Sequence, residues 1–371
     1  MPVSEKQRKR LVVKVGTNTL TGGEDGLSRP QMLGVVRQIG RLLRAGHQVA
    51  LVSSGAIVAG RQALHVARNG KDIPFKQVLA AVGQAKLMQA WDQLFSTEDV
   101  IVAQTLLTRG DLADRQGYLN ARNTLLALLE RNVVPIINEN DVVATEEIKI
   151  GDNDNLSALV ANLIDADLLI LLTDQAGLYT ADPRRSSTAT LIAEVSVISE
   201  DIIALAAGAG TARGTGGMVT KVQAARLATE SGVTVVVAGG TTENVLVKAV
   251  SGEPVGTRFP SNRTRMESRK RWILSGLARK AAAQIDPGAV LALKRGRSLL
   301  PAGIVDVKGP FDRGDSVNIV GPDGKPVGCG VANYNAADLE RIKGCRSAEI
   351  TRILGYHFGD EVIHRNNVVM L

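Results

Sequence analysis

Six short apolar runs, separated by segments with helical periodicity, constrain the fold of this chain more than any other feature of its sequence. In the first intervening segment Leu33, Val36, Ile39 and Leu43 recur at helical spacing before Gly46, and residues 77–95 and 120–132 also read as helices. Strands that alternate with helices form a parallel sheet covered on both faces, so the sequence predicts an α/β fold. The apolar runs are residues 11–18, 49–52, 100–107, 133–137, 166–174 and 233–240.

Two clusters of amides and carboxylates follow the fourth of these runs. Residues 138–141 read Asn-Glu-Asn-Asp, and residues 151–155 read Gly-Asp-Asn-Asp-Asn before a helix predicted from residue 156. Ligands of open α/β sheets bind beyond the carboxyl ends of the strands, so the two clusters predict the walls of one polar small-molecule site. The alternative is a pair of Asx-rich turns and a helix cap. Residues 53–56, Ser-Ser-Gly-Ala, form a weaker anion-site signal after the second run.

Two lysines occur where an anion would explain them. Lys14 lies inside the first apolar run, where a lysine is costly to bury unless it meets an anion or lies on an edge strand. Lys221 closes the segment 214–221, Gly-Thr-Gly-Gly-Met-Val-Thr-Lys, whose backbone N–H groups can form an anion nest at a helix start. A flexible glycine loop without a ligand is the alternative. The sequence contains no P-loop motif, and the glycines of residues 208–214 do not form the dinucleotide-binding motif.

None of these candidate residues is a histidine or a cysteine. The histidines (His47, His65, His357 and His364) are scattered and expected at the surface or in turns, and Cys329 and Cys345 lack metal-ligand spacing. Zinc chemistry and a histidine base are therefore not expected. Lysines, a glycine-rich nest and an Asn/Asp pocket suit phosphoryl transfer, in which positioning and charge neutralisation supply most of the catalysis.

The length of 371 residues predicts two or three domains. All of the net charge of +7 lies after residue 260, much of it in the run 263–271, which also looks like a linker. Short strands and frequent Gly/Pro turns in residues 280–371 predict a small β-barrel. Residues 1–10 are basic without an apolar core, and no apolar run is long enough to span a membrane, so a cytoplasmic protein without membrane association is expected.

Several of these segments, in this order, closely resemble the glutamate 5-kinases of the amino acid kinase family. They are VVKVGTN, SSGA, INENDVVATEEIKIGDNDNLSAL, LLTDQAGLYTADP and GTGGMVTK, all within residues 11–260. The segment that begins GAVLALKRGRSLLPAG resembles the PUA domain. The resemblance implies an amino acid kinase domain over residues 1–260, a basic linker over 261–279 and a PUA domain over 280–371.

The resemblance also implies an activity: transfer of the γ-phosphate of ATP to the side-chain carboxylate of L-glutamate, giving γ-glutamyl phosphate in the first step of proline biosynthesis. Lys14 and Lys221 would bind the ATP phosphates, and Asp154 would orient the two lysines. Mg²⁺ would arrive bridging the phosphates. The implied glutamate-binding residues are Ser54, Asp141 and Asn153, and the implied nucleotide-binding residues are Lys14, Thr173, Asp174, Thr215, Gly216, Gly217, Met218, Val219, Thr220 and Lys221.

The resemblance further implies feedback inhibition by proline and a homo-oligomer, either a dimer or a tetramer. Two alternatives remain open from the sequence. One is a related kinase acting on N-acetylglutamate, aspartate, carbamate or UMP. The other is an RNA-binding protein, because PUA domains often contact RNA and this end of the chain is basic. The low aromatic content of residues 280–371 and the linker position of much of the charge disfavour RNA binding.

Overall fold

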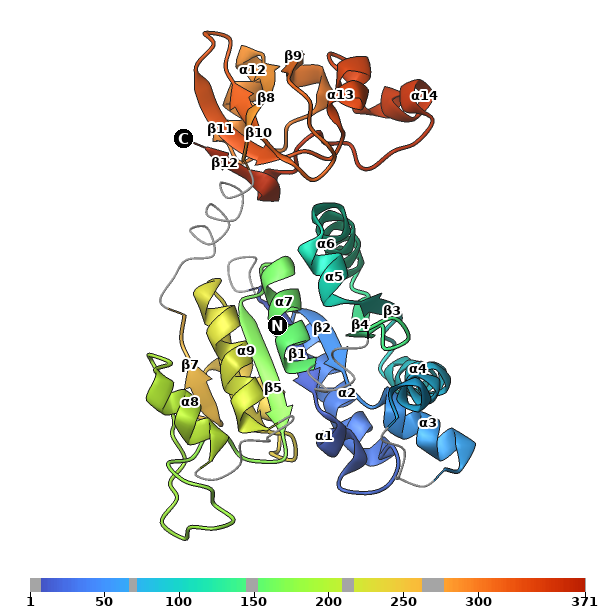
Figure 1. The fold of residues 1–371 in the computed structure, drawn as a ribbon, viewed down its shortest axis with the longest axis vertical. Coiled ribbons are helices and arrows are strands. Elements are labelled where there is room, and N and C mark those ends of the chain that lie inside the picture. Colours follow the sequence, from blue (N-terminus) through green and yellow to red (C-terminus); the bar gives the residue numbers. More distant parts are fainter. Residues whose placement is uncertain (1–7, 67–71, 145–152, 209–216, 262–276, 371) are drawn as a thin grey trace. The chain divides into compact units, whose positions relative to one another are not determined.

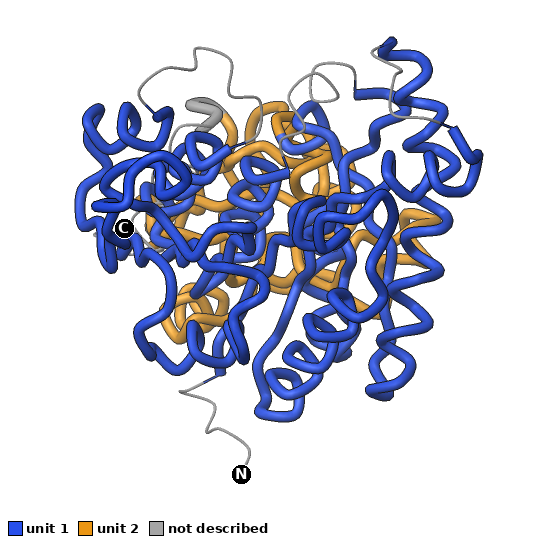
Figure 2. Tube along the Cα trace, turned by 90° about the horizontal axis from the view of Figure 1, so that it is seen from below, with its two compact units in different colours: residues 1–112, 121–265 blue, residues 113–120, 266–371 orange. Residues whose placement is uncertain are grey.

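The computed structural model describes residues 8–66, 72–144, 153–208, 217–261 and 277–370, and for residues 277–280 the backbone only. Two compact units are present, shown in Figure 1 and coloured separately in Figure 2. One contains residues 1–112 and 121–265, and the other contains residues 113–120 and 266–371. Most of the predicted linker, with its basic run 263–271, lies outside the described residues.

The first unit is built on a seven-stranded sheet with the strand order β3-β4-β2-β1-β5-β6-β7. Six strands are parallel and β7 is antiparallel to β6, which confirms the predicted mainly parallel sheet. The chain adds β2 on one side of β1 and later β5 on the other, so β1 lies at the centre. The strands are β1 (Arg10–Val15), β2 (Gln48–Ser53), β3 (Val102–Leu107), β4 (Val134–Glu139), β5 (Leu168–Thr173), β6 (Thr234–Gly239) and β7 (Thr257–Phe259).

Helices cover both faces of this sheet (Figure 1). Leu11, Val13 and Val15 of β1 share a core with helices α2, α4 and α10. The alternate side chain of Lys14 points to the opposite face, where it meets α7. The helices before residue 260 are α1 (Thr17–Thr21), α2 (Arg29–Arg44), α3 (Ala56–Leu64), α4 (Ile73–Ser96), α5 (Arg109–Ala113), α6 (Arg115–Glu130), α7 (Asn153–Leu163), α8 (Glu200–Ala207), α9 (Met218–Glu230) and α10 (Val245–Ser251).

Helices α3 and α4 pack with their backbones almost in contact. A Cβ atom on Gly83 of α4 would lie 1.7 Å from the carbonyl oxygen of Ala56, and one on Gly60 of α3 would lie 1.9 Å from that of Leu79. Only glycine fits at either position without a backbone shift. The two glycines therefore fix the position of α4 against the first turn of α3.

Three local predictions need correction. The fourth strand was expected to end at Ile137, but β4 continues through Asn138 and Glu139, because their backbones keep pairing with β3. The following helix was expected from residue 156, but α7 begins at Asn153, so the second polar cluster supplies its first turn. His47 is neither exposed nor in a turn: it is buried just before β2, and its Nδ1 accepts a hydrogen bond from the backbone N–H of Lys9.

The second unit has a separate five-stranded sheet with the order β12-β11-β10-β8-β9. Its core includes Phe311, Ile319, Tyr334 and Ile363. The strands are β8 (Leu277–Ile285), β9 (Ile304–Lys308), β10 (Ser316–Val320), β11 (Pro326–Val331) and β12 (Val368–Met370). The helices are α12 (Pro287–Lys294), α13 (Ala336–Ile342) and α14 (Ile350–Leu354), with 3₁₀ turns η2 (Pro301–Gly303), η3 (Ser347–Glu349) and η4 (Arg365–Asn367). Across the described part of the chain, no helix has the length and apolarity needed to span a bilayer.

Candidate active site

Two buried lysines share one buried carboxylate at the carboxyl end of the central strand. Lys14 Nζ of β1 lies 2.6 Å from Asp154 Oδ1, and Lys221 Nζ of α9 lies 3.1 Å from Asp154 Oδ2. Thr220 Oγ1 donates a third contact to Oδ2 at 2.7 Å. These three buried charged side chains therefore carry a net charge of +1, which favours an additional anion beside them.

The electrostatics of Asp154 keep it ionised. Burial alone would raise the pKa of this carboxyl group. The ammonium groups of Lys14 and Lys221 and the hydrogen bonds from Lys14 and Thr220 outweigh that effect and lower the pKa to about 2. An acid with so low a pKa is a poor proton donor or acceptor near neutral pH. Asp154 is thus suited to hold the two lysines rather than to move a proton.

The start of α9 brings Lys221 to this site. Gly217 is the N-cap residue, with φ −133° and ψ −155°, and Met218 begins the helix. Gly217, Met218 and Val219 line the same cavity as Lys14 and Lys221. The first turn of a helix offers backbone N–H groups and the positive end of the helix dipole, which add to the charge of the lysines. Two other residues predicted for this loop, Thr215 and Gly216, lie outside the described residues.

Thr173, the last residue of β5, and Asp174, which follows it, line the same cavity as the lysines. Asp174 accepts hydrogen bonds from Thr173 Oγ1 at 3.1 Å and from Asn18 Nδ2 at 3.2 Å. Partial burial would raise the pKa of Asp174, but these hydrogen bonds outweigh it and lower the pKa. Asn18 was not singled out in the sequence, although it stands in the glycine-containing segment after β1.

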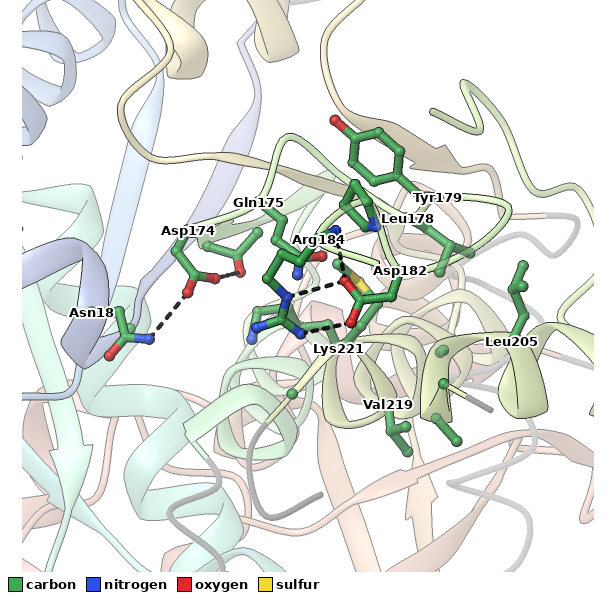
Figure 3. Close-up of a pocket in the computed structure, with 18 of the residues that line it drawn as sticks. Asn18, Asp174, Gln175, Leu178, Tyr179, Asp182, Arg184, Leu205, Val219 and Lys221 are labelled. Atoms are coloured by element: carbon green, nitrogen blue, oxygen red, sulfur yellow. Dashed lines mark hydrogen bonds and ion pairs between the residues drawn. The ribbon is translucent and has the colours of Figure 1, made fainter. Parts of the chain in front are cut away.

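These residues line one cavity of about 1270 Å³ (Figure 3). Its other wall comes from residues 178–186 and 204–208. Residues 178–183 belong to a segment that carries the family resemblance, but no candidate site residue was predicted in either stretch. Arg184 enters this wall and is held by Asp182 through two hydrogen bonds of 3.0 and 3.1 Å (Figure 3). Tyr179 and Leu205 also line the cavity (Figure 3). This wall combines irregular backbone with the end of α8, so no single sequence pattern identifies it.

The predicted acceptor residues Ser54 and Asn153 meet next to Asp154. Asn153 Nδ2 donates to Ser54 Oγ at 3.1 Å and to Asn138 Oδ1 at 2.9 Å. Asn138 and Asn153 are buried, and they come from the ends of β4 and the start of α7. The two polar clusters seen in the sequence therefore meet through Asn138 and Asn153. Asn138 belongs to the candidate site although the sequence did not distinguish it from its neighbours.

Asp141 lies in the turn after β4 and is half-buried. Gln77 of α4 donates to the backbone carbonyl oxygens of Asp141, at 3.3 Å, and Val142, at 2.9 Å, which holds this turn against the helix. Burial raises the pKa of Asp141 to about 6, and no ion-pair partner for it is found among the described residues. A partly buried carboxylate of this kind is a suitable partner for a cationic ligand group.

The described residues contain no group of three or more His, Cys, Asp or Glu side chains placed to hold a metal ion. Asp154, the carboxylate nearest the lysines, already has both oxygens engaged by Lys14, Lys221 and Thr220. The arrangement fits a magnesium ion that is carried mainly by the phosphates of a nucleotide and takes few protein ligands.

Two family models match this chain. Residues 9–239 match the model of the amino acid kinase family, and residues 282–354 match that of the PUA domain. The solved structure of a UMP kinase from Bacillus anthracis is similar with a TM-score of 0.48 at 12% sequence identity, covering 69% of this chain and 97% of that chain.

Curated relatives match almost from end to end. A glutamate 5-kinase of Herpetosiphon aurantiacus is 56% identical, over 97% of this chain and 98% of the relative. The glutamate 5-kinases of Dehalococcoides mccartyi and Deinococcus radiodurans are 51% and 50% identical, covering 100% and 98% of this chain and all of each relative. With a family model that matches most of the chain and relatives of this identity, the chain belongs to the amino acid kinase family.

Proposed function

We propose that this protein is a glutamate 5-kinase, which transfers the γ-phosphate of ATP to the side-chain carboxylate of L-glutamate and forms γ-glutamyl phosphate, in the first step of proline biosynthesis. The observation that carries the proposal is the position of the Asp154-linked lysine pair directly beside Ser54 and Asn153. One half of the site suits phosphate and the other suits a carboxylate. The relatives named glutamate 5-kinase support the choice of acceptor.

At the phosphate end, Lys14 and Lys221 bind the transferred phosphoryl group and neutralise the charge that spreads over its oxygens. Their ammonium groups are held 2.6 and 3.1 Å from opposite oxygens of Asp154, so little reorganisation is needed when the phosphate arrives. Gly217, Met218, Val219 and Thr220 at the start of α9 bind nucleotide phosphate, with Thr215 and Gly216 before them, and Thr173 with Asp174 contacts the nucleotide from the end of β5. Mg²⁺ bound to ATP would supply further neutralisation between the phosphates.

At the acceptor end, Ser54 and Asn153 hold the reacting carboxylate of glutamate and Asp141 binds its ammonium group. An oxygen of the side-chain carboxylate attacks the γ-phosphorus while the bond from that phosphorus to the bridging oxygen breaks, and ADP leaves with the electron pair. No general base is required, because a glutamate side chain is already ionised near pH 7. The role of Asp154 is therefore to position the lysines, in agreement with its lowered pKa.

The test is to measure ADP release in the presence of ATP, Mg²⁺ and hydroxylamine, with L-glutamate, N-acetylglutamate, aspartate or UMP supplied separately. Hydroxylamine converts an acyl phosphate into a hydroxamate, which reports phosphorylation of a carboxylate and not of water. Glutamate-dependent ADP release with one hydroxamate per ADP is the expected result. Faster turnover on another acceptor would replace glutamate as substrate, and failure on all four would overturn the proposal.

Three further properties are part of the proposal: inhibition by proline, assembly into a homo-oligomer and a cytoplasmic location. The similarity to glutamate 5-kinases over nearly the whole chain supports them. Inhibition is tested by adding proline to the hydroxamate assay, and assembly by light scattering of the purified protein. We do not favour RNA as a partner. RNA binding that weakens with salt and disappears when residues 261–371 are removed would argue for it.

A further inference from the structure

A chain of side-chain amides connects the candidate active site to α4. Asn153 Nδ2 donates to Asn138 Oδ1 over 2.9 Å, and Asn138 Nδ2 donates to Gln84 Oε1 over 2.8 Å. Asn153 Nδ2 also lies 3.3 Å from the backbone carbonyl oxygen of Ser53. Because a carbonyl oxygen can only accept a hydrogen bond, this contact fixes Asn153 as a donor, and the orientation of each following amide is fixed in turn.

The chain of side-chain amides ends in a donor for which the described residues provide no acceptor. Gln84 Nε2 is shielded from water and has no hydrogen-bond partner among the described residues. A buried polar group left without a partner costs free energy, and such groups are rare in native proteins. Since Gln84 Oε1 is engaged by Asn138, the amide cannot turn over without losing that bond. The geometry thus leaves an N–H group directed to an acceptor that the described residues do not provide.

Helix packing holds Gln84 at this place. Its neighbour Gly83 packs so closely on α3 that an added Cβ would lie 1.7 Å from the Ala56 carbonyl oxygen and 2.4 Å from the backbone nitrogen of Gly60. Ala56 follows Ser54 by two residues, so Gln84 stands beside the turn that carries Ser54. One heptad earlier on the same face of α4, Gln77 holds the turn of Asp141. The helix thus reaches both walls of the acceptor site.

We infer that Gln84 binds substrate directly, by donating a hydrogen bond from Nε2 to the α-carboxylate of the amino acid acceptor. This inference rests on the proposed function. Asn153 is next to Asp154, which holds the two lysines proposed to bind the phosphoryl group. The reacting carboxylate of the acceptor must therefore lie at the Asn153 end of the amide chain. Gln84 is two amides away, at the other end of the acceptor, where a second carboxylate needs a donor. Asp141 takes the ammonium group between them.

The experiment compares two acceptors on the Gln84→Glu variant. This change keeps an oxygen that accepts from Asn138 but replaces the N–H donor with a negative oxygen. The KM for L-glutamate should rise about 10- to 100-fold, the effect of losing a hydrogen bond to a charged group. The kcat and the KM for ATP should change little. L-Glutamic acid α-amide keeps the reacting carboxylate but carries an NH₂ group that can donate to the introduced carboxylate, so its KM should rise much less.

Gln89→Glu is the matched control, because Gln89 lies on the same helix, is exposed, and undergoes the same change of charge. Both KM values should stay at those of the parent protein. An unchanged glutamate KM in Gln84→Glu, or an equal rise for both acceptors, would overturn the inference. If Gln84→Glu does not fold, Gln84→Met removes the donor without adding charge and should raise the glutamate KM selectively. A parent protein that forms no hydroxamate from glutamate would instead overturn the proposed function itself.

Discussion

The indole Nε1 of Trp91 donates a hydrogen bond to the hydroxyl oxygen of Ser53 over 2.9 Å, with both residues fully buried. The Ser53 hydroxyl in turn donates to the carbonyl oxygen of Ser54 at 2.9 Å. The largest fully buried side chain, Trp91, therefore orients the turn that carries Ser54, which we propose binds the acceptor.

Replacing Trp91 by Phe should keep most of the packing against Phe95, whose ring lies 5.9 Å away between centroids. It should leave the Ser53 hydroxyl without its donor. We expect the free energy of unfolding in urea to fall by about 1–3 kcal/mol and the glutamate KM to rise. A double-mutant cycle with Ser53→Ala should give a coupling free energy above zero. Strict additivity of the two substitutions would show that the contact contributes nothing.

Replacing Asp154 by Asn should remove the negative charge between Lys14 and Lys221. We expect a loss of stability of about 3 kcal/mol, because two buried ammonium groups then lie side by side without a counter-charge. The pKa of Asp154 is lowered on folding to about 2, so its stabilisation is complete above about pH 4 and is lost as the pH falls to 2. Urea unfolding of both proteins at pH 7, 5 and 3.5 should show a constant difference at the first two values and a smaller one at the third. A difference independent of pH throughout would contradict this.

Replacing Lys221 by Ala should reduce turnover far more than acceptor binding, because in the proposed function this lysine binds the transferred phosphoryl group and not glutamate. We expect kcat to fall by about 100-fold or more, with a glutamate KM close to that of the parent. Steady-state kinetics with the hydroxamate assay measure both constants. Lys86→Ala, at an exposed lysine of α4, should leave both unchanged. A large rise in glutamate KM for Lys221→Ala would place this lysine at the acceptor instead.

Asp141 gives a pH-dependent prediction. Burial raises its pKa to about 6, and only the ionised form can bind an ammonium group, so kcat/KM for glutamate should fall as the pH drops below about 6. Asp141→Asn should raise the glutamate KM and remove this acidic limb. Because the raised pKa makes the carboxylate unfavourable in the folded state above that pH, the same variant should be more stable than the parent at pH 7 without substrate. Thermal melts and pH–rate profiles test the two expectations separately.

The contact between α3 and α4 gives a prediction with an internal control. Gly83→Ala should destabilise the protein by about 1–3 kcal/mol, because the new methyl group would overlap the Ala56 carbonyl oxygen. Gly34→Ala, at an exposed position of α2 with no atom within 4 Å of the added Cβ, should instead stabilise by about 0.5–1 kcal/mol. Urea unfolding measures both. Equal effects of the two substitutions would contradict the packing of these helices.

Much of this arrangement could be predicted from the sequence, because parallel strands and the turns that end them are local features. The run around Lys14, the polar clusters around Asn138 and Asn153 and the glycines before Lys221 all stand where strands end or helices begin. Local patterns could not show where β4 ends, because its last two residues are polar and are paired only through β3. Nor could they identify Gln84 or Arg184. Gln84 reaches the site through the packing of α4 on α3, and Arg184 is positioned by an irregular loop.

The ion pairs of Asp154 with Lys14 and Lys221 also have a consequence for synthesis on the ribosome. Lys14 emerges early, but its counter-ion follows 140 residues later, and Lys221 another 67 residues after that. The ribosome adds residues from the N-terminus onward at about 5–20 per second. For many seconds the nascent chain therefore contains the central strand with Lys14 but not yet Asp154. Closing that strand into a sheet would bury an uncompensated charge. Completion of the core and of the candidate active site should therefore coincide, late in translation, so that a half-made chain neither folds stably nor consumes ATP.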